Sequence, residues 1–184
     1  MIGDGDGPRP VISRLGEDDW RAWRQVRLAA LADAPESFAG TVARAAALGE
    51  PDWRAMIREG AVFLATAGGP AIGAAAGVPR ESPADRGLGA MWVAPPWRGR
   101  GIAALLAGAV IGWARSQGCA RVGLWVPADN VPARAFYQRQ GFRPNGRVLP
   151  FPGAAHRSIC EMWLDLAPGS AGLAAGPAGR PPGR

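Results

Sequence analysis

The chain of 184 residues contains no lysine, one histidine (His156), one tyrosine (Tyr137) and two cysteines. The absence of lysine excludes the phosphate-binding loop of P-loop nucleotide-binding proteins, whose pattern ends in Lys-Ser or Lys-Thr. Cys119 and Cys160 are not spaced as metal ligands, and the chain has only one histidine as a further ligand. Both observations argue against a zinc or other metal site. We expect both cysteines to be reduced, buried residues of strands.

Long apolar runs are also missing. No stretch of 18 or more apolar residues occurs, so no membrane-spanning helix and no membrane partner are predicted. The N-terminus lacks the basic segment and following apolar segment of a secretion signal, which predicts a cytoplasmic location. An apolar fraction of 48% over this length is sufficient for the core of one domain.

The net charge of +6 is carried by arginine alone. A basic balance can indicate nucleic-acid binding. The arginines are scattered, however, and the sequence shows neither a basic helix nor alternating basic and aromatic residues. Binding of a polyanionic cofactor would explain part of the excess of positive charge, so nucleic acid is the less favoured partner.

The two ends of the chain differ in composition from its middle. Residues 1–9 are rich in Gly, Asp and Pro, and residues 167–184 in Gly, Pro and Ala. This composition predicts a flexible N-terminus and a disordered tail. A single domain is therefore expected over residues 10–166.

The most informative stretch is residues 91–103, Met-Trp-Val-Ala-Pro-Pro-Trp-Arg-Gly-Arg-Gly-Ile-Ala. Its first three residues suit a buried strand, which the two prolines end. A helix is predicted from about residue 101 or 102 to about residue 117, and Gly118 can close it in the left-handed conformation. Its expected buried stripe consists of Ile102, Leu105, Leu106, Ala109, Val110 and Trp113.

A strand, a glycine-rich turn and a helix N-terminus together form an anion site. The first helical N–H groups have no intrahelical partner, and the helix dipole is positive there. Gly99 and Gly101 would let a diphosphate approach the backbone, and Arg98 and Arg100 add positive charge. Position 104 is Ala where the Rossmann fingerprint requires Gly. The stretch therefore predicts a phosphorylated cofactor outside the two common nucleotide motifs.

This stretch resembles the acetyl-CoA loop of the GNAT acetyltransferase superfamily, whose pattern is Gln/Arg-x-x-Gly-x-Gly/Ala. A second stretch resembles the family's N-x-x-A-x-x-x-Y-x-x-x-G-F at the expected distance downstream. The matching residues are Arg98, Gly101 and Ala103 in the first stretch, and Asn130, Ala133, Tyr137, Gly141 and Phe142 in the second. The resemblance covers residues 10–166 and is most specific between residues 91 and 142.

The resemblance implies an α/β fold. Its sheet would be mixed and mostly antiparallel, with six to seven strands, helices on both faces and splayed central parallel strands. The sequence pattern places strands at 10–15, 61–66, 71–78, 87–93, 121–126, 147–151 and 158–166. The gap between the fourth and fifth strands would expose backbone to the pantetheine arm of the cofactor.

The resemblance also implies an acetyl-CoA-dependent N-acetyltransferase in which a primary amine of a small molecule or protein attacks directly. Tyr137 would protonate the departing thiolate and contact the cofactor, since a phenol is protonated at neutral pH. Asn130 would contact the pantetheine arm or cap a helix. The other cofactor contacts would be Met91, Trp92 and Val93 for the pantetheine, and Arg98, Gly99, Arg100, Gly101, Ile102 and Ala103 for the diphosphate.

The general base is left open by the sequence. Many relatives carry a glutamate on the fourth strand, but residues 87–91 contain none. Glu36 lies in a segment, residues 33–38, that resembles one lying over the acceptor site in a branch of the family, although a solvated turn carboxylate is somewhat favoured over a catalytic role. The remaining candidates are Glu81, Glu161, His156 in the turn before the last strand, and a water relay.

Two other functions are considered. The first is a non-catalytic acyl-CoA-binding module, which the presence of Tyr137 argues against. The second is an arginine-rich nucleic-acid binder, for which strong salt dependence of DNA binding would be the mark. The sequence does not name the acceptor, and it leaves a homodimer open.

Overall fold

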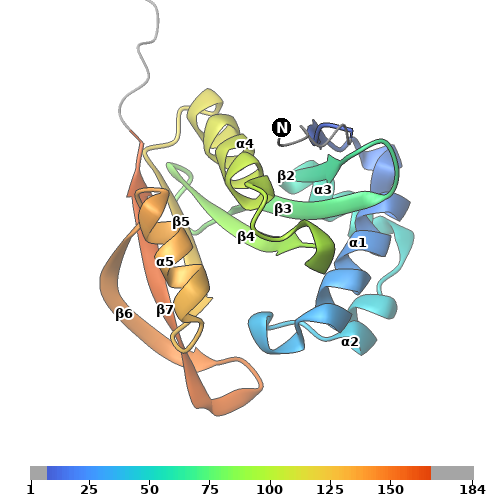
Figure 1. Cartoon of the computed structure of the whole chain (residues 1–184). Coiled ribbons are helices and arrows are strands. Elements are labelled where there is room, and N and C mark those ends of the chain that lie inside the picture. Colours follow the sequence, from blue (N-terminus) through green and yellow to red (C-terminus); the bar gives the residue numbers. More distant parts are fainter. Residues whose placement is uncertain (1–7, 167–184) are drawn as a thin grey trace, which may run out of the picture.

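A computed structural model describes residues 8–166 as one seven-stranded sheet with helices on both faces (Figure 1). The order is β1-β2-β3-β4-β5-β7-β6, and only β4 and β5 are parallel. This confirms the predicted fold class. The N-terminal residues 1–7 and the tail from 167 lie outside the described residues. The strands are β1 (Val11–Arg14), β2 (Ala61–Thr66), β3 (Ala71–Pro79), β4 (Asp85–Val93), β5 (Arg121–Pro127), β6 (Arg143–Phe151) and β7 (Ala154–Asp165).

Two hydrophobic cores lie on opposite faces of the sheet. Strand β2 contributes to both by alternation, with Phe63 packed in the core of α4 and α5 and Leu64 in the core of the first three helices. Trp23 and Trp53 meet edge to face in the second core, with ring centroids 6.4 Å apart. The helices are α1 (Trp20–Asp33), α2 (Val42–Ala46), α3 (Glu50–Glu59), α4 (Ile102–Ser116) and α5 (Val131–Arg139), with short 3-10 turns at Glu17–Asp19, Pro35–Ser37 and Pro95–Trp97.

The buried face of α4 differs from the predicted stripe. Leu105 was expected in the core, but 48% of it is exposed. Because α4 is apolar almost all round, the spacing of apolar residues does not identify which side meets the sheet. Gly118 follows the helix with φ +69°, as predicted. The residues of α4 that are buried are Ile102, Leu106, Ala107, Val110, Ile111 and Ala114.

The last two strands are longer than predicted. β6 starts at Arg143 instead of 147, and β7 starts at Ala154 instead of 158, so His156 lies in a strand and not in the turn. β6 is an edge strand whose residues 143–150 are all exposed, so its sequence needs no apolar alternation. Cys160 lies in β7 and is half-buried, while Cys119 is buried just before β5 and not within a strand.

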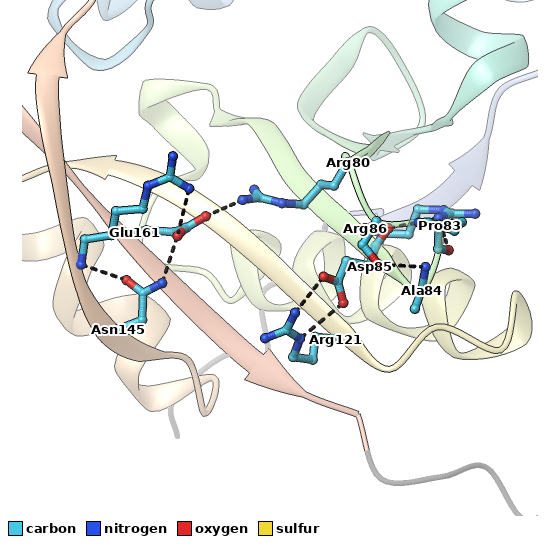
Figure 2. Close-up of polar contacts among 10 residues, drawn as sticks. Arg80, Pro83, Ala84, Asp85, Arg86, Arg121, Asn145 and Glu161 are labelled. Carbon is cyan, nitrogen blue, oxygen red and sulfur yellow. Dashed lines mark hydrogen bonds and ion pairs between the residues drawn. The ribbon is translucent and has the colours of Figure 1, made fainter.

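The parallel strands β4 and β5 pair over only three residues each. The pairs run from Asp85 with Arg121 to Gly87 with Gly123, after which the strands separate. An ion pair holds the closed end, because Arg121 donates from Nε and Nη2 to the buried Asp85 carboxylate at 3.1 and 2.7 Å (Figure 2). Beyond Gly87 and Gly123 the two strands no longer pair with each other, which is the predicted splay.

A bulge bends β4 where the separation begins. Gly89 pairs with Ala76 and Trp92 with Ala74, so β4 holds one more residue than β3 over this interval. Ala90 lies in the bulge with φ +51°, the one non-glycine residue between 8 and 166 with a positive φ. The left-handed conformation costs an L-residue about 1–2 kcal/mol, so the bulge is strained at Ala90.

Ala90→Gly is expected to raise the free energy of unfolding by about 0.5–1 kcal/mol. Glycine removes the strain at φ +51° but adds about 0.5–1 kcal/mol of backbone entropy to the unfolded chain. Ala75→Gly is the matched control, because Ala75 faces the bulge from β3, is fully buried and has no positive φ. Urea unfolding should show Ala75→Gly destabilised; equal destabilisation of Ala90→Gly would contradict the assignment of strain.

Candidate active site

A cleft of about 790 Å³ opens where β4 and β5 separate. This volume is within the usual range for small-molecule and cofactor sites, about 300–1,000 Å³. The first turn of α4, the inner side of α5 and the segment between α1 and α2 form its other walls. Of the predicted cofactor contacts, those that line the cleft are Met91, Trp92, Val93, Arg98, Gly99, Gly101, Ile102, Ala103, Asn130 and Tyr137.

The turn before α4 is open to an incoming anion. Gly99 and Gly101 have φ of +76° and +80°, values that L side chains rarely adopt. A Cβ at either position would meet no other atom within 4 Å, so their backbone faces free space. The helix begins directly after Gly101, and Ala104 donates its N–H to the Gly101 carbonyl at 3.0 Å, while the N–H groups of Ile102 and Ala103 have no intrahelical acceptor. An open helix N-terminus of this kind is what an anion site requires.

The two arginines of this turn are engaged by the protein itself. Arg98 donates from Nε to the Val93 carbonyl at 3.0 Å and forms an ion pair with Asp33. The same Asp33 oxygen accepts the Trp92 indole N–H at 2.8 Å. Arg98 therefore connects the turn to the end of β4 and to α1. Arg100 does not line the cleft, and its guanidinium stacks on Trp97 at 5.2 Å.

Tyr137 lies on the inner face of α5 and is buried. Its ring packs edge to face against Phe136 and Phe142, with centroids 5.1 and 5.8 Å away. Burial raises the pKa of the Tyr137 phenol above its ordinary value, so the hydroxyl stays protonated at neutral pH. Tyr137 also lines the cleft, which brings a proton donor to the place where the strands separate.

Asn130 is the N-cap of α5. Its side-chain oxygen accepts the N–H of Ala133 at 3.1 Å, which satisfies one of the free donors of the first turn. Of the two roles left open by the sequence, the cap is therefore present. Because α5 carries Tyr137, this cap also helps to fix the start of the helix that presents the phenol.

Only one of the four side chains considered as general base lines the cleft. Glu36 does so, from the short turn Pro35–Ser37, whereas Glu81, Glu161 and His156 do not. Glu161 is 2% exposed and binds Arg80 and, at 2.8 Å, Asn145 on the sheet face away from α4 and α5 (Figure 2). Burial alone would raise the pKa of the Glu161 carboxyl, but hydrogen bonds from Asn145 and Trp163 and the charge of Arg80 hold it below its usual value.

Several residues of the site have no signal in the sequence. Ala90 is an ordinary alanine in a strand, and only the strand register reveals its bulge. Trp125 and Phe136 line the cleft but have the residue types and spacing of core residues. Asp33 lies in the segment 33–38 that the sequence marks, yet its role as acceptor for Arg98 and Trp92 depends on contacts 65 and 59 residues away.

The family model for the Acetyltransferase (GNAT) family matches residues 18–142. This range contains both motifs and every residue that lines the cleft. The chain belongs to the GNAT acetyltransferase family. Its enzymes use acetyl-CoA to acetylate amine acceptors, and this protein is one of these acetyltransferases.

Solved structures share the fold at low sequence identity. An acetyltransferase of the GNAT family from Streptococcus pneumoniae aligns with a TM-score of 0.73 and 16% identity, over 86% of this chain and 100% of that chain. A structure from Salmonella typhimurium with its cofactor acetyl-CoA aligns with a TM-score of 0.69 and 17% identity, over 90% of this chain and 99% of that chain. The ribosomal-protein-S18-alanine N-acetyltransferase from Escherichia coli aligns with a TM-score of 0.63 and 19% identity, over 85% of this chain and 94% of that chain. Curated protein sequences give no match.

The described part of this GNAT chain has neither a membrane-spanning helix nor a cluster of metal-ligating side chains. Within residues 8–166, no helix is long and apolar enough to cross a membrane. The same range contains no group of three or more His, Cys, Asp or Glu side chains placed to hold a metal ion.

Proposed function

We propose that this GNAT protein transfers the acetyl group of acetyl-CoA directly to a primary amine, with Tyr137 as the general acid. The observation that carries the proposal is the meeting of three features in one cleft. These are an open helix N-terminus with two left-handed glycines, unpaired strand backbone, and a buried phenol. Each suits a different part of the cosubstrate: the diphosphate, the pantetheine amides and the thioester sulfur.

The residues present fit acetyl-CoA. Gly99 and Gly101 leave room at the N–H groups of α4, where a diphosphate is stabilised by hydrogen bonds and the helix dipole. Trp92 and Val93 pair with β3, Met91 lies in the bulge, and none of the three pairs with β5. This edge of β4 can therefore offer backbone groups to the pantetheine, apart from the Val93 carbonyl that Arg98 occupies. Acetyl-CoA supplies the acetyl thioester. Arg98 supports the loop through Asp33, and Arg100 remains available for the outer phosphates.

The chemistry requires one bond to form and one to break. The amine nitrogen bonds to the acetyl carbon, and the carbon–sulfur bond breaks. The Tyr137 hydroxyl gives its proton to the departing thiolate. Burial raises the pKa of the phenol and so keeps this proton in place until the thiolate departs. The amine loses a proton to Glu36, directly or through water, because Glu36 is the one carboxylate among residues 8–166 that lines the cleft.

The acceptor is a primary amine of a small molecule or a protein. The Escherichia coli neighbour is a ribosomal-protein-S18-alanine N-acetyltransferase, but at 19% identity it shares only the fold with this chain and does not identify its acceptor. The alternative of a non-catalytic acyl-CoA-binding module leaves the placement of Tyr137 in the cleft unexplained. Nucleic-acid binding gains little support from the site, because only two arginines line the described cleft, Arg98 and Arg139, and Arg98 is paired with Asp33.

The proposal is tested by incubating the purified chain with acetyl-CoA and a library of primary amines and peptides. Mass spectrometry should find at least one product with the added mass of an acetyl group, formed together with free CoA thiol. Reactions without the protein correct for spontaneous acetylation. Tight binding of acetyl-CoA without acetylation of any amine would instead support the non-catalytic module.

A further inference from the structure

One arginine connects three segments beside the cleft. Arg157 donates from Nε and Nη2 to both carboxylate oxygens of Asp129, at 2.7 and 2.8 Å. Its Nη1 donates to the backbone carbonyl of Glu36 at 2.8 Å. Its guanidinium also stacks on the ring of Phe151, 4.8 Å from the centroid. The three partners come from the turn after α1, the turn before α5 and the end of β6.

The register of the sheet places Arg157 at this position. The pairing of β5 with β7 ends at Pro127 and Ile159, and Ala128 then donates its N–H to the Ser158 carbonyl at 2.9 Å. The next residue of each chain segment is Asp129 and Arg157, so the two side chains meet just beyond the last ladder contact. The Arg157 side chain is 20% exposed, which leaves it little freedom to leave its partners.

The segment 33–38 is held at its other end as well. Asp33 binds Trp92 and Arg98, at the end of β4 and in the cofactor loop. Ala34 lies between the two attachments and lines the cleft, as do Glu36, at the second attachment, and Ser37 and Phe38, which follow it. The segment thus extends from the cofactor loop to the turn before α5, fixed by Asp33 at the first and by Arg157 at the second.

We propose that Arg157 is a positioning residue, which holds the segment 33–38 across the acceptor side of the cleft and so sets the affinity for the amine. This rests on the proposed function, because it takes the amine to enter beside Glu36. A displacement of about 1 Å in a positioning group can cost about a hundredfold in rate. Arg157 does not contact the cofactor loop itself, and Asp33 joins the segment to that loop independently of Arg157, so acetyl-CoA binding should change much less than amine affinity.

The geometry requires arginine. A planar guanidinium can bind both oxygens of Asp129 and still direct a third N–H at a carbonyl, whereas the lysine ammonium is a point charge. Because the Asp129 side chain is 57% exposed, its ion pair with Arg157 contributes little to overall stability, and the main effect of losing Arg157 is local. The segments it joins should loosen while the sheet remains intact.

The first test is hydrogen exchange of the full chain, read by mass spectrometry. In Arg157→Met, amides of residues 33–38 and 127–130 should exchange about tenfold faster, and those of α4 should not change. Arg157→Lys should behave like the Met variant and not like the unaltered protein. Arg54→Met is the matched control, because Arg54 also joins separate segments through Glu50 and Asp18, both at 2.7 Å, away from the cleft. Unchanged exchange at both segments, or an equal increase throughout the chain, would overturn the proposal.

The second test uses benzylamine as probe, a primary amine whose ring suits the cleft residues Phe38 and Trp125. Arg157→Met should raise the KM for benzylamine about tenfold and change the Kd of acetyl-CoA much less. Faster exchange with an unchanged KM would show that Arg157 holds the segment but does not serve the acceptor, which overturns the assigned role. Failure of the proposed function would give a different result. In that case the unaltered protein would acetylate no amine, while the difference in hydrogen exchange between the variants would still be observed.

Discussion

Tyr137→Phe is expected to lower kcat by about ten- to a thousandfold, with little change in acetyl-CoA affinity. The hydroxyl acts as the thiolate departs, and an interaction made late in the reaction lowers the barrier without tightening ground-state binding. The phenylalanine ring keeps the edge-to-face contacts with Phe136 and Phe142. The measurement is kcat with a saturating amine, beside the Kd of acetyl-CoA from calorimetry.

Stability provides the control for this variant. No hydrogen bond to another group within residues 8–166 depends on the Tyr137 hydroxyl, and the cause of its raised pKa is burial. The melting temperature of Tyr137→Phe should therefore stay close to that of the unaltered protein. An unchanged kcat, once chemistry is shown to limit the rate, would assign Tyr137 to packing. Collapse of acetyl-CoA affinity would make the hydroxyl a binding contact and place the acid elsewhere.

Gly101→Val is expected to weaken acetyl-CoA binding by about a hundredfold or more. The new side chain would project into the free space before the N–H groups of α4, where we propose that the diphosphate binds. Each charge-assisted hydrogen bond lost is worth about 1.5–3 kcal/mol, so two lost bonds already exceed a hundredfold. Calorimetric titration with CoA measures the effect.

Gly118→Val is the matched control for backbone strain. Gly118 lies at the other end of α4 with φ +69°, and a Cβ added there would likewise meet no atom within 4 Å, but it does not line the cleft. Both valine variants should lose similar stability, because a β-branched residue is strained at positive φ. Only Gly101→Val should lose CoA affinity. Equal affinity of the two variants would refute the diphosphate assignment.

The sequence alone determined the cofactor loop, the helix that follows it and the position of the phenol. Each of these features is local, because the glycines, the prolines and the helix N-terminus act within about one turn of one another. The spacing of Asn130 and Tyr137 likewise places both on one helix, and Asn130 caps it. The family resemblance then supplied the fold class and the splayed pair of parallel strands, which composition and periodicity do not contain.

The tertiary structure alone decided how these parts are arranged around the cleft. The bulge at Ala90 arises from the register of β4 against β3, and the exposure of Leu105 from the way α4 lies on the sheet. The attachment of Glu36 by Arg157 joins residues 121 positions apart. Such contacts depend on the pairing of distant strands, and no pattern within a short window of sequence records which strand ends will meet.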